Sequence, residues 1–98
     1  MIRKSYYNDG NACRVTFRFE PDSETVSSVN LVSEVDDWDT VARPMTRRKD
    51  GSFSTSVTMR PGRYRFRYLV DGQRWVNDHN ADDFVDNGHG DVDGVVDV

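Results

Sequence analysis

The chain has 98 residues, with 13 Lys and Arg against 17 Asp and Glu and a formal net charge of -4 at pH 7. This length allows one domain with one modest core. The acidic balance argues against a general binder of nucleic acid or of anionic membranes, which needs a basic face. No stretch has the apolar character of a secretory signal or a membrane span, so we expect a soluble cytoplasmic protein.

Apolar and polar residues alternate along most of the chain, a pattern typical of half-buried β-strands. The predicted strands are residues 15–19, a strand that begins at Val29, and residues 53–59, 63–70, 73–76 and 92–98. Asp71-Gly72 is a hairpin signature because both central residues of such a turn favour positive φ. Short strands near ten-residue spacing, without helical periodicity, predict an all-β antiparallel sandwich of six to seven strands.

Two stretches, residues 33–44 and 77–91, are long for hairpin loops, and loops on a rigid β scaffold often carry binding sites. Trp38 lies among carboxylates in the first stretch, and Trp75 directly precedes the second. Each indole either covers core residues at the edge of the sandwich or forms an exposed aromatic platform. Two platforms beside Arg, Asp and Asn side chains suit an oligosaccharide, because the C–H face of a pyranose ring is flat and apolar.

Seven short motifs follow one another along the chain. They are Val29-Asn30-Leu31-Val32, Asp36-Asp37-Trp38-Asp39, Pro44-Met45, Asp50-Gly51-Ser52-Phe53, Pro61-Gly62, the run from Tyr64 to Trp75, and the run from Asp93 to Val98. In this order they resemble the family-48 carbohydrate-binding modules, which include the glycogen-binding domain of AMP-activated protein kinase β-subunits and the N-terminal early-set domains of isoamylases and branching enzymes. The resemblance implies an immunoglobulin-like sandwich over residues 13–98, with residues 1–12 as a short N-terminal extension.

The resemblance also implies a non-catalytic function, the recognition of an α-1,4-glucan such as glycogen, starch or a maltooligosaccharide. Trp38 and Trp75 match the two tryptophans of that family that stack on glucose rings. Arg67 matches a lysine that hydrogen-bonds glucose hydroxyls. Asp93 falls where the family carries an asparagine, and His89 falls near a leucine that inserts into the curved glucan. Because Asp93 lacks the amide donor and His89 lacks an aliphatic side chain, we expect weaker or altered glucan binding.

Two other functions stay open on the same fold. One is a protein-interaction or regulatory module with a degenerate sugar site, and the other is the accessory domain of a larger family-13 glycoside hydrolase. Arg63, Arg65 and Arg67 share one strand face. This arginine stripe can contact sugar hydroxyls, bind the acids of a partner, or pair with the acidic end of the chain. That end, residues 75–98, holds seven aspartates and no Lys or Arg.

Catalysis and cofactor binding are not expected. Surface acids in loops are usually solvated, so we expect no catalytic carboxylate pair. Residues 77–83 and 88–94 are rich in oxygen ligands, but neither stretch has the acidic residue that ends a calcium loop. We therefore interpret both as solvated acidic loops and expect no metal. Cys13 is the single cysteine, which excludes an intrachain disulfide, and it is expected to pack as a small apolar residue.

Overall fold

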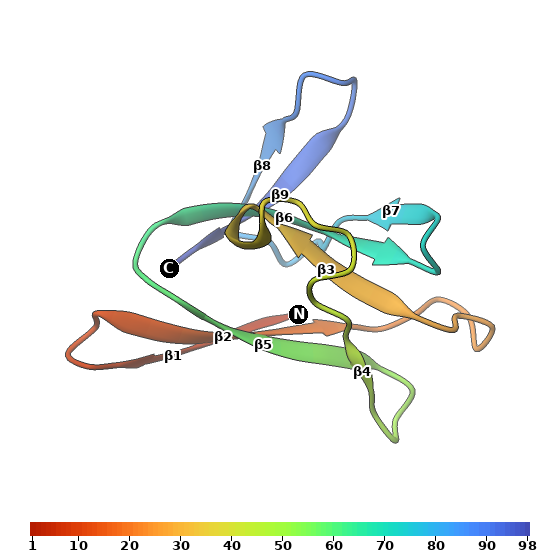
Figure 1. Cartoon of the computed structure of the whole chain (residues 1–98), viewed down its shortest axis with the longest axis horizontal. Coiled ribbons are helices and arrows are strands. Elements are labelled where there is room, and N and C mark those ends of the chain that lie inside the picture. Colours follow the sequence, from red (N-terminus) through yellow and green to blue (C-terminus); the bar gives the residue numbers. More distant parts are fainter.

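The computed structural model describes residues 1–98 and contains nine β-strands and one short 3-10 helix (Figure 1). The elements are β1 (Ile2–Tyr7), β2 (Ala12–Phe19), β3 (Val29–Ser33), η1 (Glu34–Asp36), β4 (Thr46–Arg47), β5 (Phe53–Met59), β6 (Arg63–Val70), β7 (Arg74–Val76), β8 (Asp83–Asp86) and β9 (Val92–Asp97). All strand pairs are antiparallel. No helix has the length and apolar character needed to cross a membrane.

The strands form two sheets that pack as a sandwich, which confirms the predicted fold class. The four-stranded sheet has the order β1-β2-β5-β4, and the five-stranded sheet has the order β3-β6-β9-β8 with β7 also paired to β6. Along one edge, β6 pairs with β3. Along its other edge, β6 pairs first with β9, at residues 63–66, and then with β7, at residues 68–70. Arg67 therefore lies where β6 changes partner.

The core lies between the two sheets and follows the alternation seen in the sequence. It comprises 15 buried side chains: Cys13, Val15, Phe17, Phe19, Val26, Val29, Leu31, Met45, Phe53, Val57, Met59, Phe66, Tyr68, Val70 and Val96. Aromatic rings contact across the sandwich, with ring centroids 5.0 Å apart for Phe17 and Phe66 and 5.1 Å apart for Phe19 and Tyr68. Tilted aromatic pairs at this separation add to the stability that burial provides. Cys13 is fully buried in this cluster, as expected.

The observed nine strands exceed the six to seven predicted. The three additional strands are β4, with only two residues, β8, which lies inside the second long loop, and β1, which lies in the segment expected to precede the sandwich. Alternation does not reveal β1 because one of its inward positions is Lys4, whose ammonium reaches Asp82 at 2.7 Å instead of entering the core. Alternation does not reveal β8 either, because aspartates occupy both of its ends.

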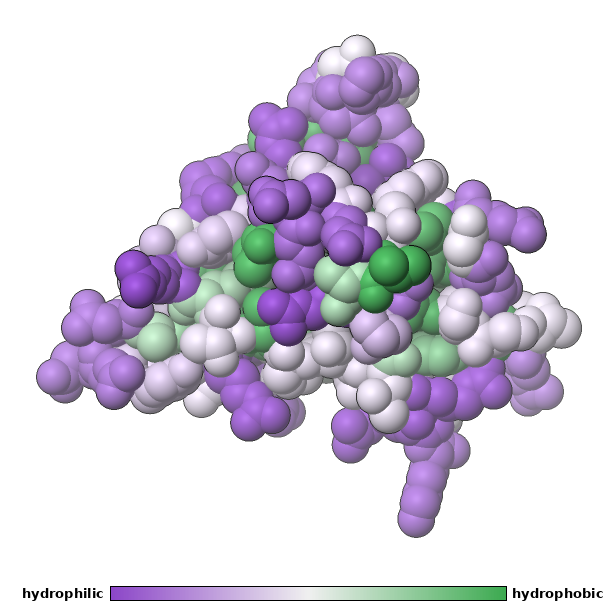
Figure 2. Space-filling view, viewed as in Figure 1, coloured by the Kyte–Doolittle hydropathy of each residue, from purple (hydrophilic) through white to green (hydrophobic).

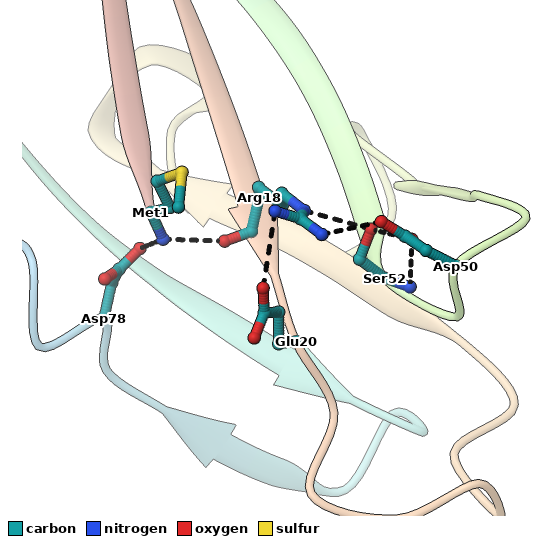
Figure 3. A network of polar contacts seen from close by, with 6 residues as sticks. All are labelled: Met1, Arg18, Glu20, Asp50, Ser52 and Asp78. Atoms are coloured by element: carbon teal, nitrogen blue, oxygen red, sulfur yellow. Dashed lines mark hydrogen bonds and ion pairs between the residues drawn. The ribbon is translucent and has the colours of Figure 1, made fainter.

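Polar contacts fasten the start of β1 to both sheets (Figure 3). The amino group of Met1 donates to the carbonyl of Arg18 and to the carboxylate of Asp78, both at 2.8 Å. Asp78 also accepts a hydrogen bond from the buried hydroxyl of Tyr68 at 2.8 Å. On β2, the guanidinium of Arg18 contacts Asp50 at 2.7 Å. The two layers are thus joined by polar links at the edge as well as by the apolar core.

Two hairpins project from the sandwich, β8–β9 at the top of the view and β4–β5 at its lower right (Figure 1). In the space-filling view both projections are hydrophilic, whereas apolar surface gathers in the middle of the molecule (Figure 2). The β6–β7 turn has the predicted conformation, since Asp71 and Gly72 have φ of 53° and 67°. The Asp71 carboxylate also accepts hydrogen bonds from the backbone N–H groups of Ser27 and Ser28, and these bonds hold the turn against the loop before β3.

Candidate functional site

An open groove of ≈ 560 Å³ lies on the outer face of the five-stranded sheet. Nine residues line it: Glu34, Trp38, Thr40, Arg65, Arg67, Trp75, Asn87, His89 and Asp93. These include all five residues predicted from the sequence, although they come from the loop after β3, from β6, from β7 and from the β8–β9 hairpin. The fold therefore brings into one groove side chains that are spread over more than half of the sequence, from Glu34 to Asp93.

Trp38 forms one end of the groove and is 37% exposed. The chain turns sharply after β3, because Asp37 and Trp38 both adopt left-handed backbone conformations, with φ of 53° and 61°. Two hydrogen bonds close this turn, from the Asp37 N–H to the Glu34 carbonyl and from the Trp38 N–H to the Ser33 carbonyl. Left-handed conformations cost non-glycine residues about 1–2 kcal/mol each. Such strain is common at binding sites, where it holds a side chain in position.

Trp75 lies on β7 opposite Leu69 and is 42% exposed. The guanidinium carbon of Arg67 lies 5.6 Å from the centre of the Trp75 ring, a cation–π contact. Only 12% of the Arg67 side chain is exposed, and its Nη2 also donates to Asp91 at 2.9 Å. Arg67 is thus held between the indole and the carboxylate, and it stacks against one face of Trp75.

The β8–β9 hairpin supplies the opposite wall. Its five-residue loop, residues 87–91, is closed by a hydrogen bond from the Asn87 N–H to the Asp91 carbonyl, and His89 at its tip donates its N–H to the Asn87 side chain at 2.9 Å. Asp93 follows on β9 and is only 6% exposed. The Asp93 carboxylate lies 3.8 Å from the guanidinium of Arg65. Asp93 therefore already has a charged neighbour inside the protein.

A second, small apolar layer supports the groove from below. Val32, Leu69 and Val95 are at most 7% exposed, yet they do not belong to the core cluster between the sheets. By register they share the outer face with the arginine stripe, since Val32 pairs with Arg67 and Val95 pairs with Arg65. Burying three aliphatic side chains on an outer face stabilises whatever covers them. The loop after β3 and the groove side chains are that cover.

The arginine stripe pairs with the acidic end of the chain. Arg63 contacts Asp83 and Asp97 at 2.9 and 3.0 Å. The two other arginines of the stripe reach Asp93 and Asp91, as described above. Pairing with the acidic end of the chain is one of the three roles that the sequence left open for the stripe. It also shows that the interpretation of residues 77–83 and 88–94 as solvated acidic loops is wrong, because strand pairing and ion pairs hold most of their aspartates.

The electrostatics of these carboxylates follow from their contacts. The backbone N–H of Val92 and the guanidinium of Arg67 lower the pKa of Asp91. The backbone N–H of Phe84 and the guanidinium of Arg63 do the same to the pKa of Asp83. Burial raises the pKa of the Tyr68 phenol, and the adjacent Asp78 carboxylate raises it further. Asp83 and Asp91 are therefore ionised at neutral pH, and each compensates the charge of an arginine of the stripe.

Four lining residues were not among the predicted site residues: Glu34, Thr40, Arg65 and Asn87. Glu34 uses one carboxylate oxygen to accept the backbone N–H of Arg65 at 2.7 Å, so it joins η1 to β6. Arg65 was predicted only as part of the stripe, and its side chain is 42% exposed. No group of three or more His, Cys, Asp or Glu side chains in the structure has the arrangement of a metal site. The groove thus offers aromatic faces and hydrogen-bonding groups.

Comparison with known proteins gives two curated relatives. The chain is 39% identical over 67 residues to the protein FLOURY ENDOSPERM 6, chloroplastic, of Oryza sativa subsp. japonica, which covers 68% of this chain and 12% of that protein. It is 39% identical over 49 residues to the protein PTST homolog 2, chloroplastic, of Arabidopsis thaliana, which covers 50% of this chain and 9% of that protein. The matches thus span about a tenth of each relative's length.

The names of both relatives place them in the chloroplast, which contradicts the expected cytoplasmic location. The composition of residues 1–98 is compatible with more than one compartment, so it does not determine the location. The family comparison covers more of the chain. The family described as the glycogen recognition site of AMP-activated protein kinase matches residues 13–98. The chain belongs to this family of glycogen-binding carbohydrate-binding modules.

Proposed function

We propose that the chain is a non-catalytic module that binds α-1,4-glucan chains in the groove of the five-stranded sheet by stacking glucose rings on Trp38 and Trp75. The observation that carries the proposal is that both tryptophans are exposed and line one groove. A tryptophan offers a flat apolar face at a low cost in side-chain entropy, which suits the C–H face of a glucose ring. The polar side chains that line the same groove then form hydrogen bonds with the glucose hydroxyls.

Two arginines of the groove take different roles in this proposal. Arg65 is 42% exposed and its one charged neighbour is 3.8 Å away, so its N–H groups are free to donate to glucose hydroxyls. Arg67 is almost covered and is already engaged by Asp91 and Trp75. Arg67 is therefore a positioning residue, which fixes the plane of the Trp75 ring. This assignment moves the direct hydroxyl contact from Arg67, as the sequence predicts it, to Arg65.

Three further groups on the groove walls complement an oligosaccharide. One carboxylate oxygen of Glu34 accepts the hydrogen bond from β6, and the other is available to a sugar hydroxyl. Thr40 contributes a hydroxyl group and Asn87 a side-chain amide to the groove lining. Asp93 is largely buried, so it supports the wall and does not meet the sugar directly. A protein-interaction surface is less favoured here, because the ion pairs of the arginine stripe leave few free charges for a partner's acids.

The test is a titration with maltoheptaose and with β-cyclodextrin, in which binding is measured by tryptophan fluorescence and by calorimetry. The chain contains only two tryptophans, and both line the groove, so the intrinsic emission reports on this site alone. We expect Trp38→Ala and Trp75→Ala each to weaken binding about tenfold or more, because each removes a stacking platform. Tyr6→Ala is the matched control, since it removes an exposed aromatic ring that does not line the groove.

Two results would contradict the proposal. If wild-type protein gives no signal with either glucan, the module does not bind α-glucans. If it binds them and the tryptophan variants bind equally well, the groove is not the site. Cellohexaose, with β-1,4 links, is the control ligand and should bind at least about tenfold more weakly if the groove recognises α-1,4-glucan, because its straight chain presents its rings differently from a curved α-1,4 chain.

The roles of the two arginines are separable by the emission of the unliganded protein. Arg65→Ala should weaken glucan binding while leaving this emission unchanged. Arg67→Ala should weaken binding and also shift the emission of Trp75, because the guanidinium over that ring is lost. The shift is measured on the Trp38→Phe background, where Trp75 is the only emitter. An unchanged emission in Arg67→Ala would show that this arginine does not position the indole.

A further inference from the structure

The outer face of the four-stranded sheet has a chemistry unlike that of the groove. Besides Tyr7 and Ala12, the register of β1, β2 and β5 places eight polar side chains there, on the side away from the core: Arg3, Ser5, Arg14, Thr16, Arg18, Ser54, Ser56 and Thr58. We call this surface the hydroxyl–arginine face. Three of these side chains are guanidinium groups and five are hydroxyls, with no carboxylate among them. Thr16 and Ser56 are hydrogen-bonded to each other at 2.9 Å across β2 and β5.

The positive charge of this face is largely uncompensated. Arg3 and Arg14 form no ion pair in the structure. Arg48, at the rim, donates only to the hydroxyl of Ser54 at 3.3 Å. Arg18 alone is paired, with Glu20 and Asp50. A chain with a net charge of -4 thus carries an excess of positive charge on one sheet face, which marks it as a surface for an anionic group.

Two shallow hollows lie on this face. One, of ≈ 480 Å³, is lined by Ser5, Tyr7, Arg14, Ser56 and Thr58. The other, of ≈ 330 Å³, is lined by Met1, Arg3, Thr16, Arg18, Arg48, Asp50 and Ser54. Each hollow has an arginine with no carboxylate partner and several hydroxyl groups on its walls. Together they provide donors for carboxylate oxygens along the seam between β1 and β2.

The spacing of the arginines along this seam is regular. Arg14 and Arg18 lie on β2, and Arg3 on β1 is paired with Thr16, midway between them. Because a strand rises by about 3.4 Å per residue, the three positions follow one another at intervals of about 7 Å along the strand direction. An extended polypeptide places every second side chain at the same interval. Acidic residues at alternate positions would therefore meet Arg14 and Arg3, the two arginines without an ion pair, in step.

The edge of the sheet itself is protected against a further strand. Lys4 on β1 points inward between the sheets and is paired with Asp82 at 2.7 Å. An inward-pointing charge on an edge strand is a common device against edge-to-edge pairing. A bound peptide should thus lie on top of the face, along the strand direction, and should not add a strand to the edge of the sheet. Single-stranded nucleic acid fits less well, because it needs aromatic platforms and Tyr7 is the only aromatic residue lining the hollows.

We propose that the hydroxyl–arginine face docks an extended acidic segment of a partner protein, with Asp or Glu at alternate positions bound by Arg14 and Arg3. The glucan groove lies on the other sheet, so the two sites can be occupied at the same time. The module would then hold a glucan on one side and a protein on the other. This inference does not depend on the proposed glucan function.

The test uses a fluorescein-labelled ten-residue peptide of five Glu-Thr repeats, with binding followed by anisotropy at about 50 mM NaCl, where charges are weakly screened. We expect saturable binding that the double variant Arg3→Ser, Arg14→Ser weakens about tenfold or more. Arg60→Ser is the matched control, since Arg60 is an exposed arginine that also forms no ion pair but does not line the hollows, and it should change the affinity by less than about twofold.

Control probes separate the possible outcomes. A peptide of five glutamates followed by five threonines has the same charge without the alternation and should bind several times more weakly. A ten-nucleotide oligothymidylate should also bind more weakly. The proposal is overturned if the alternating peptide does not bind, if the double variant binds it equally well, or if either control probe binds as tightly. An unchanged circular dichroism spectrum and unfolding midpoint show that the double variant is folded, so a loss of binding reports on the face.

Discussion

The two outer faces of the sandwich carry similar numbers of arginines in opposite electrostatic states. On the five-stranded sheet, Arg63, Arg65 and Arg67 each face an aspartate of the β8–β9 hairpin. On the four-stranded sheet, Arg3 and Arg14 have hydroxyl groups as strand neighbours and form no ion pair. The same side chain is therefore part of the structure on one face and available for binding on the other. Alternating arginines on a strand do not by themselves indicate which of the two roles applies.

The difference arises from the order of the chain. Residues 75–98 hold seven aspartates and no Lys or Arg. Because β9 pairs with β6 and β8 pairs with β9, four of these aspartates, Asp83, Asp91, Asp93 and Asp97, reach the arginine stripe. The outer face of the four-stranded sheet receives none of these aspartates, so Arg3 and Arg14 are left without a carboxylate partner. The net charge of -4 hides this division completely. The neutral aromatic groove and the basic polar face follow from where one acidic segment packs.

Acid should affect the five-stranded sheet most. Neighbouring N–H groups and cations lower the pKa of six aspartates, and four of them, Asp78, Asp82, Asp83 and Asp91, belong to the last 24 residues. A carboxyl whose pKa is lower in the folded state stabilises the fold above its unfolded pKa, near 4, and this contribution is lost as the pH falls through the folded pKa. We expect a nearly constant Tm between pH 7 and 5 and a fall of about 15 °C or more by pH 2.5.

Thermal unfolding followed by circular dichroism measures this effect. In the double variant Asp83→Asn, Asp91→Asn, the fall in Tm between pH 5 and 2.5 should be smaller than in wild type, because two of the titrating groups are gone. Asp9→Asn is the control, since Asp9 lies in the β1–β2 turn of the other sheet and forms no ion pair. An equal fall in all three proteins would mean that acid acts elsewhere in the molecule.

Most of the fold, but not all of it, follows from local sequence patterns. The alternation in β2, β5 and β6 places the core correctly because every inward position except Thr55 of β5 is apolar or aromatic. The strand β1 escapes this reasoning, since its inward Lys4 is explained only by Asp82, which lies 78 residues further along the chain. The strand β8 escapes it because its register with β9, and not its own composition, determines which residues face inward.

The site was predictable to a similar extent. The resemblance located Trp38, Trp75, Arg67, His89 and Asp93, and the structure places all five around one groove. The assignment of roles depends on details that local sequence does not contain. Whether Arg65 or Arg67 is free depends on which aspartate lies opposite each of them, and the direction of Trp38 depends on two consecutive left-handed residues after η1.

A matched pair of arginine variants compares the two faces directly. Arg67→Ala should lower the free energy of unfolding by about 1–3 kcal/mol, because it removes a largely buried side chain that contacts both Trp75 and Asp91. Arg14→Ala should change it by less than about 0.5 kcal/mol, as expected for an exposed side chain without partners. Urea unfolding at pH 7 measures both values. Similar values for the two variants would contradict the division between a structural and an available arginine.

Salt should have the smallest effect on the groove and a large one on the opposite face. The groove arginines are compensated within the protein and glucans are uncharged, so the Kd for maltoheptaose should change by less than about twofold between 50 and 500 mM NaCl. The alternating acidic peptide should lose affinity by about tenfold or more over the same range, because its contacts are exposed ion pairs. Both titrations use one preparation of protein, so a change in folding would appear in both. A glucan affinity that falls with salt as steeply as the peptide affinity would show that an uncompensated charge acts in the groove, and Arg65 would be the first residue to examine.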